Sequence, residues 1–110
     1  DDARANVENV IETSKLPNAY LKLSGFHYLT DKTWNFPYND TRWVYEECYE
    51  AFGTNMVWGS DFPVVKKSMT HLQAIEAFRT HCDFVSEADK KAILGGTLEG
   101  LLEQARVVNK

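Results

Sequence analysis

Hydrophobic side chains follow two different spacings in the first part of the sequence. They recur every three or four positions over residues 3–14, which predicts an amphipathic helix. The Pro17-Asn18 pair then predicts a turn. Residues 19–23 alternate between aliphatic and other side chains, a pattern that predicts a short strand. We therefore expect a helix and a strand joined by a tight link.

The alternation over residues 19–23 assigns the side chains of this strand to two faces. Leu21 and Leu23 share the face that helices should cover, and Lys22 and Ser24 share the opposite face. In a barrel of parallel strands, the opposite face lines the lumen that leads to the mouth. An edge strand whose Lys22 faces water would show the same alternation, so both interpretations stay open.

A second helix and a second strand are predicted after a long loop. Asp40-Thr41 is suited to cap a helix over residues 42–52, and Gly53 is suited to end it. The apolar run at residues 56–58 predicts a strand, and a turn follows it over residues 59–63.

Helical patterns dominate the remainder of the sequence. We expect helices over residues 70–82, 86–94 and 97–107, with Gly95-Gly96 breaking the last two apart and Thr97 capping the final one. Because strands alternate with helices, the sequence predicts an α/β fold with a parallel sheet and right-handed crossovers.

Composition narrows the class of protein. With 110 residues, 44% hydrophobic and 25% charged, the chain matches one ordinary globular domain. Its net charge of −4 and the lack of a basic run argue against a nucleic-acid partner. No apolar run approaches the roughly 20 residues that cross a bilayer, so we expect no membrane partner. Cys48 and Cys82 have no redox or metal spacing, which favours buried thiols in a reducing, cytoplasmic setting.

Asp61 is the first candidate for chemistry. It lies just beyond the predicted strand 56–58, where α/β enzymes place catalytic or metal-binding carboxylates. Ser60 and Asp61 are also common turn formers before a proline, so a purely structural role explains the same residues.

The loop over residues 25–39 is rich in aromatic side chains. Its aromatic and histidine residues are Phe26, His27, Tyr28, Trp34, Phe36 and Tyr38. A loop of this length is uncommon unless it covers a site, and flat rings give a ligand large contact area. The alternative is that the loop packs over one end of the fold. His27 lies four residues past the predicted strand, within reach of its tip, although a structural role is common for a lone histidine.

Three stretches carry a resemblance to a known family. They are LPNAYLKLSG at residues 16–25, WGSDFP at 58–63 and AILGGT at 92–97. In this order they resemble the C-terminal part of the amidohydrolase-2 family, predicted metal-dependent hydrolases of TIM-barrel fold within the amidohydrolase superfamily. The resemblance extends over about residues 3–102.

The resemblance implies a TIM (β/α)8 barrel in which this chain supplies the last two βα units and the terminal helices. Residues 19–23 would form strand seven and residues 56–58 strand eight. Residues 1–110 would then be one partial amidohydrolase-type barrel domain, with no second domain.

The resemblance also implies chemistry for Asp61. In this family the Asp after strand eight contacts the metal or acts as general base toward metal-bound water, and that role is carried to Asp61. The implied cofactor of the full-length protein is a divalent metal ion, with zinc as our expectation. The parent protein would hydrolyse a lactone, an amide or a similar small carbonyl compound. Lys22, Ser24, His27 and Trp34 are the candidate contacts to this small-molecule substrate.

The chain departs from the family pattern in its other metal ligands. It contains no His-x-His pair, and His27, His71 and His81 do not match the positions of the family's ligands. A catalytic zinc needs three protein ligands. We therefore expect the 110-residue chain to be inactive alone, and it need not bind a metal.

Other functions remain open from the sequence. The same superfamily includes decarboxylases and hydratases. The chain could instead be an inactive, truncated barrel fragment with an assembly role, or a binding module that uses the aromatic loop. Two βα units leave sheet edges unpaired, so we expect either a homo-oligomer or the remainder of a longer chain around it.

Overall fold

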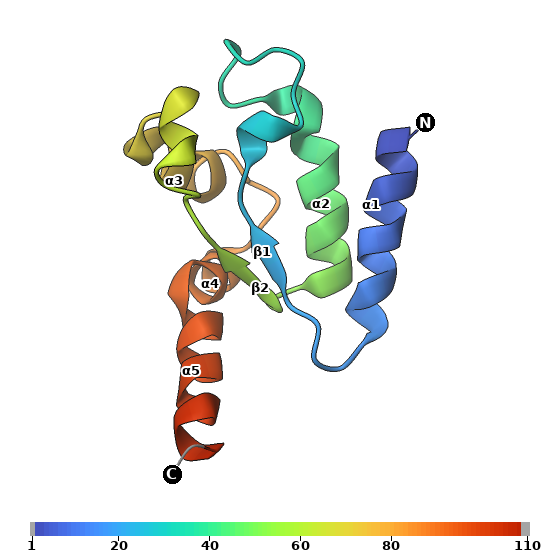
Figure 1. The fold of residues 1–110 in the computed structure, drawn as a ribbon, viewed down its shortest axis with the longest axis vertical. Coiled ribbons are helices and arrows are strands. Elements are labelled where there is room, and N and C mark those ends of the chain that lie inside the picture. Colours follow the sequence, from blue (N-terminus) through green and yellow to red (C-terminus); the bar gives the residue numbers. More distant parts are fainter. Residues whose placement is uncertain (1, 109–110) are drawn as a thin grey trace.

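Two short parallel strands lie at the centre of the molecule, with helices on both sides of them (Figure 1). The computed structural model describes residues 2–108. Its helices and strands are, in order, α1 (Asp2–Glu12), β1 (Leu21–Leu23), α2 (Arg42–Phe52), β2 (Met56–Trp58), α3 (His71–Arg79), α4 (Glu87–Lys91) and α5 (Thr97–Val108). The predicted alternation is confirmed, and the fold is mixed helix and sheet with a small parallel sheet.

The register of the two strands aligns their carboxyl ends. Leu21 lies opposite Met56, and Leu23 lies opposite Trp58. Just beyond β2, the Gly59 N–H donates to the Leu23 carbonyl, with N and O 3.1 Å apart. The segments that follow β1 and β2 therefore leave the sheet side by side at the carboxyl ends of the strands, which is where α/β folds build sites.

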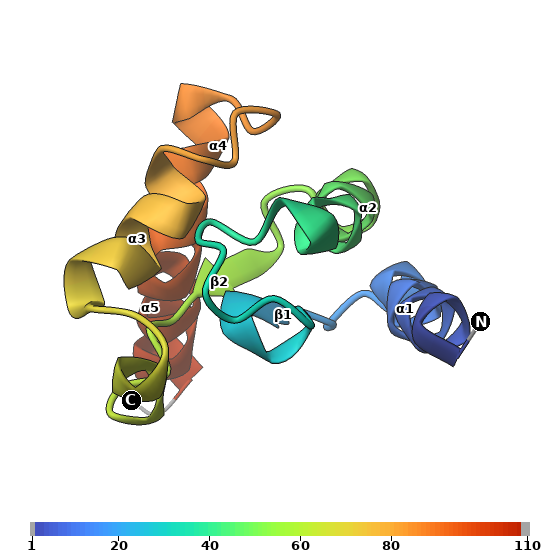
Figure 2. The same cartoon turned by 90° about the horizontal axis from the view of Figure 1, so that it is seen from above.

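Helices bury one set of strand side chains and leave the other set outside. Leu23 and Met56 are 3% and 1% exposed, whereas Lys22 between the two leucines of β1 is exposed. Helices α1 and α2 lie on one side of the strands, and α3, α4 and α5 lie on the other (Figure 2). The largest fully buried side chains are Tyr38, Met56, Val65, Phe78 and Ile93.

Hydrogen bonds define several helix ends, and the predicted end of α2 at Gly53 is confirmed. Gly53 ends α2 with φ +56°, and its N–H donates to the Tyr49 carbonyl at 2.8 Å. Thr70 caps α3, because its hydroxyl accepts from the Gln73 N–H at 3.0 Å while the Gln73 side chain accepts from the Thr70 N–H at 2.9 Å. Ser86 caps α4 by accepting from the Asp89 N–H at 3.2 Å.

The predicted cap of α2 is wrong. The Thr41 hydroxyl donates backwards to the Tyr38 carbonyl at 2.8 Å and makes no cap bond to α2. The Asp40 carboxylate accepts from the Thr30 hydroxyl, at 2.8 Å to its nearer oxygen. Both polar side chains therefore stabilise the preceding loop, which competes with the helix for such groups.

The predicted break at Gly95-Gly96 is also wrong. Residues Ala92–Gly96 form a π-helix that joins α4 to α5, and the Thr97 N–H donates to the Ala92 carbonyl. The Thr97 hydroxyl does not cap α5 but donates to the Thr54 carbonyl at 2.6 Å. Glycine disfavours a helix by about 1 kcal/mol relative to alanine. Here the burial of Ile93, 1% exposed, and the bond to Thr54 outweigh that preference.

The two cysteines are buried, as predicted from their lack of redox or metal spacing. Cys48 and Cys82 are both buried free thiols. Within residues 2–108, no helix has the length and apolar content needed to cross a membrane.

The two faces of α3 should respond differently to the same truncation. Phe78 is 0% exposed and Leu72 is 64% exposed. We expect Phe78→Ala to lower the free energy of unfolding by about 3–5 kcal/mol, because it removes transfer energy and leaves a cavity. Leu72→Ala should change it by about 0.5 kcal/mol or less. Urea unfolding of both variants checks this, and similar losses would contradict the assigned core face.

Candidate functional site

Asp61 occupies a tight turn directly after β2. Its backbone lies in the left-handed region, with φ +60°, which aspartate tolerates better than most residues. The Ser60 hydroxyl accepts from the Phe62 N–H at 3.2 Å, and the Asp61 carbonyl accepts from the Val65 N–H at 3.0 Å. These bonds fix the turn that carries the Asp61 side chain.

Two donors from the neighbouring strand and its loop meet the Asp61 carboxylate. The Lys22 Nζ atom donates to Oδ1 at 3.2 Å, and the Tyr28 hydroxyl donates to Oδ2 at 3.1 Å. Lys22 is the middle residue of β1, and Tyr28 ends the 3-10 helix Phe26–Tyr28 that follows it. Each carboxylate oxygen therefore has one partner from the β1 side of the site.

Two glycines leave the space that these donors fill. A Cβ atom on Gly59 would lie 2.8 Å from Lys22 Cε. A Cβ atom on Gly25 would lie 2.6 Å from Cδ2 of the Tyr28 ring, and Gly25 also has φ +72°. Because side chains larger than glycine would crowd Lys22 or Tyr28, both glycines help to place the partners of Asp61.

The charge state of Asp61 follows from these contacts. The hydrogen bond from Lys22, and then the bond from Tyr28, lower the pKa of the Asp61 carboxyl below its usual range. Partial desolvation raises the pKa of the exposed Tyr28 hydroxyl, and its bond to Asp61 raises it further. At neutral pH the pair therefore consists of an ionised carboxylate and a protonated phenol. The side chain of Asp61 is 32% exposed and that of Lys22 57% exposed, so solvent screens their attraction.

His27 lies behind Tyr28 and away from water. It is 7% exposed, and its ring centroid lies 4.0 Å from that of Tyr28. Burial lowers the pKa of His27, and the charge of Asp61 opposes this shift. Its buried Nδ1 atom has no hydrogen-bond partner within residues 2–108. These surroundings therefore favour a neutral His27 imidazole beside the Asp61 cluster, which consists of Asp61, Lys22 and Tyr28.

The other two predicted substrate contacts, Ser24 and Trp34, make no hydrogen bond to Asp61 among the described residues. Ser24 is half-buried, one residue beyond β1. Trp34 is 80% exposed, and within the described part of the chain no hydrogen bond or ring contact joins it to Asp61. The structure thus brings Lys22 into contact with Asp61 and leaves Trp34 outside the cluster. His27 is the neighbour in sequence of Tyr28, the other partner of Asp61.

Some side chains of the aromatic loop over residues 25–39 pack into the core, and others stay exposed near the site. Phe26 stacks on Tyr45 with ring centroids 4.0 Å apart, and Tyr38 is 1% exposed, so both pack into the core. Tyr28 and Trp34 stay exposed. Tyr28 was not among the predicted site residues, although its position three residues after Gly25 in an aromatic loop was a usable signal.

The residues of this cluster do not by themselves fit a metal ion. Within residues 2–108 no group of three or more His, Cys, Asp or Glu side chains could hold one. Both carboxylate oxygens of Asp61 already accept a hydrogen bond. Asp61 can offer one carboxylate ligand, and a zinc site with three protein ligands would need at least one of them from outside the described residues.

Comparison with known proteins gives one positive result. The family model described as Amidohydrolase matches residues 3–99, which is most of the chain. Proteins of that family commonly use a divalent metal ion. No curated protein and no solved structure was found to match.

The pKa of Asp61 should depend on Lys22 more than on Tyr28. We expect Lys22→Met to raise it toward the value of an isolated aspartate, about 3.9, and Tyr28→Phe to raise it less. Gly59→Ala should act in the same direction, because the added methyl displaces Lys22. Carbon-detected NMR titration of the Asp61 carboxyl measures the shift, with Lys91→Met as a control.

The lowered pKa of Asp61 also makes the stability of the fold depend on pH. A folded-state pKa below the unfolded value stabilises the folded state above the unfolded pKa, and this contribution is lost as the pH falls through the folded pKa. Lys22→Met should therefore lose stability at neutral pH and lose less in strong acid. An Asp61 pKa that is the same in Lys22→Met and the parent would contradict the assigned pairing.

Proposed function

The chain belongs to the amidohydrolase family, and we propose that it forms part of a metal-dependent hydrolase acting on a small carbonyl compound such as a lactone or an amide. The observation that carries the proposal is the Asp61 carboxylate, held at the carboxyl edge of two parallel strands by Lys22 and Tyr28. This edge is where barrel enzymes assemble their catalytic side chains.

We assign the roles in this hydrolase as follows. Asp61 contacts the metal or accepts a proton from the attacking water, for which its ionised state is required. Lys22 orients Asp61 and, because its side chain is more than half exposed, can also reach a substrate oxygen. Ser24, His27 and Trp34 are the other candidate contacts to the substrate.

A complete site needs elements that lie outside the described residues. The sheet has two strands, so each strand has one edge without a partner strand among residues 2–108. A groove of about 540 Å³ runs beside β1 between α1 and α2. We propose that β1 and β2 are strands seven and eight of a TIM barrel and that these residues form its C-terminal part. The rest of a longer chain, or other copies of this one, would cover the free edges.

The cofactor and the location follow from the same proposal. A divalent metal ion, with zinc as our choice, would take Asp61 as one ligand and its other ligands from the other strands of the proposed barrel. Two buried free thiols, Cys48 and Cys82, support a reducing, cytoplasmic setting.

A second candidate is an inactive barrel fragment with an assembly role. The unpaired edges of β1 and β2 favour it, because open edges of a sheet are templates for pairing with another chain. A decarboxylase or hydratase of the same superfamily would use the Asp61 cluster equally well, and product analysis separates these reactions from hydrolysis.

Removing the charge of Asp61 should abolish most of the activity. In the full polypeptide we expect Asp61→Asn to lower kcat by about 10²–10⁴-fold, because the amide cannot accept a proton. Asp83→Asn, at an exposed carboxylate paired with Arg42, is the matched control and should keep normal kcat. Steady-state kinetics with metal analysis checks both variants, and unchanged kcat in Asp61→Asn would refute the role given to Asp61.

The unpaired edges of β1 and β2 should make the chain self-associate in solution. The 110-residue chain produced alone should self-associate, because β1 and β2 leave backbone groups unpaired and α5 exposes Leu98 and Leu102, which are 47% and 57% exposed. Size-exclusion chromatography with light scattering measures the mass over a range of concentrations. A monomer with a cooperative thermal transition would count against the need for covering elements.

A further inference from the structure

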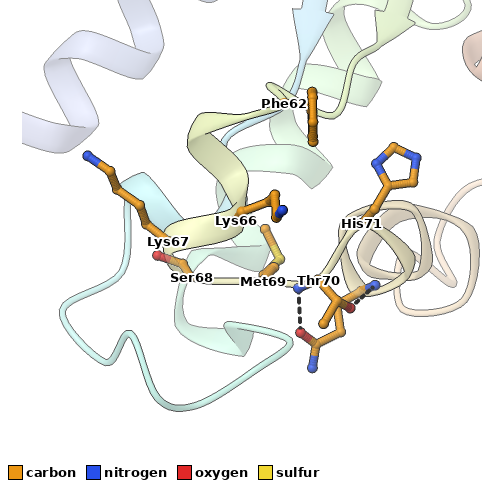
Figure 3. A pocket seen from close by; sticks show the side chains of 8 residues that line it. Phe62, Lys66, Lys67, Ser68, Met69, Thr70 and His71 are labelled. Carbon is orange, nitrogen blue, oxygen red and sulfur yellow. Dashed lines mark hydrogen bonds between the residues drawn. The ribbon is translucent and has the colours of Figure 1, made fainter.

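A pocket of about 520 Å³ opens immediately after Asp61 (Figure 3). The turn after β2, the 3-10 helix Val64–Lys67 and the first turn of α3 form its walls. Its lining includes Phe62, Lys66, Lys67, Thr70, His71 and Gln73. Phe62 belongs to this lining and follows Asp61 directly in the chain, so one wall of the pocket begins one residue from the site described above. Its volume lies in the range that small-molecule ligands occupy.

The lining of this pocket carries positive charge and no carboxylate. This contrasts with the chain as a whole, which has a net charge of −4. The Lys66 Nζ atom lies 6.0 Å from the centroid of the Phe62 ring, and it forms no ion pair within residues 2–108. In Figure 3 the Lys66 ammonium group lies on the side of Phe62 and His71, whereas the Lys67 ammonium group extends to the opposite side of the 3-10 helix.

The first turn of α3 adds donors to the same pocket. The capping box uses the N–H groups of Thr70 and Gln73. The N–H groups of His71 and Leu72 make no hydrogen bond among the described residues, and no acidic side chain lies in this turn. The partial positive charge of the helix start therefore acts in the same direction as Lys66.

We propose that this pocket binds an anionic group of the substrate, a carboxylate or a phosphate, with Lys66 as its principal partner. The pocket is in that case a specificity subsite, and this assignment rests on the proposed hydrolase function. The ionised Asp61 repels a second anion from its own surroundings, so an anionic substrate needs its charge held elsewhere. Phe62 lies between Asp61 and Lys66 in the sequence. Its ring offers an apolar wall to the part of the ligand between the reacting group and the anion.

Anion binding by the full polypeptide tests this subsite. The probes are inorganic phosphate and succinate, followed by the backbone amide signals of His71 and Leu72 in NMR titrations. We expect saturable shifts of these signals by at least one probe. Lys66→Gln should weaken that binding about tenfold through loss of a charge-assisted hydrogen bond, and Lys66→Arg should retain it. Both changes are at an exposed side chain, and a thermal melt verifies folding.

Lys67→Gln is the matched control, because it removes the same charge from the neighbouring position. We expect it to weaken binding less than twofold. Equal weakening by Lys66→Gln and Lys67→Gln would show general electrostatic attraction without a subsite, and an absence of saturable shifts with both probes would also overturn the proposal.

Asp61→Asn separates this inference from the hydrolase assignment. The variant should lose activity and keep the anion-induced shifts. If activity depends on Asp61 but neither probe binds, the hydrolase assignment stands and the subsite fails. If the probes bind through Lys66 but Asp61→Asn keeps full activity, the pocket is an anion site and its role for a substrate of Asp61 is refuted.

Discussion

The parallel register of β1 and β2 is the constraint on which the site depends. It sets the turn after β2 beside the end of β1, through the bond between the Gly59 N–H and the Leu23 carbonyl. Because side chains alternate along a strand, the register that buries Leu23 also turns Lys22 outward, toward Asp61. A slip of one residue would bury Lys22 and expose both leucines of β1. The hydrophobic core and the electrostatic site are therefore selected by the same pairing.

Space around the backbone is the second requirement of the site. Gly25 and Gly59 lie in different loops, yet each leaves room for one of the two donors to Asp61. An exposed lysine–carboxylate pair contributes little to stability by itself, since water screens the attraction and two flexible side chains must be ordered. The consequence of this geometry is therefore a defined orientation and charge state of Asp61, not a more stable fold.

The sequence predicted the parts of this structure that follow from periodic patterns. The helix over residues 42–52 and the strand over residues 56–58 agree with α2 and β2 at both ends, because a full apolar pattern and a helix-ending glycine define them. Tyr28 was missed because its direction depends on the left-handed backbone at Gly25 and on a short 3-10 helix, which leave no periodic signal. At Gly95-Gly96 the local preference of glycine pointed to a break, and tertiary contacts of the neighbouring residues overrode it. Alternation placed Lys22 on the correct face but could not reveal its partner 39 positions away.

Covering the free strand edges would change the energetics of the cluster without changing its contacts. In the described structure, solvent reaches over half of the Lys22 side chain and a third of the Asp61 side chain. Charge–charge interactions strengthen as water is excluded, because the effective dielectric constant falls. Elements packed against the open edge of β1 would therefore turn a screened pair into a strongly coupled one and hold Asp61 more firmly ionised. By the same argument, Lys66 would attract an anion more strongly at the edge of a closed site than on an open surface. The geometry at the strand ends is already in place, and the covering elements of the proposed barrel would add a drier environment in which these charges act.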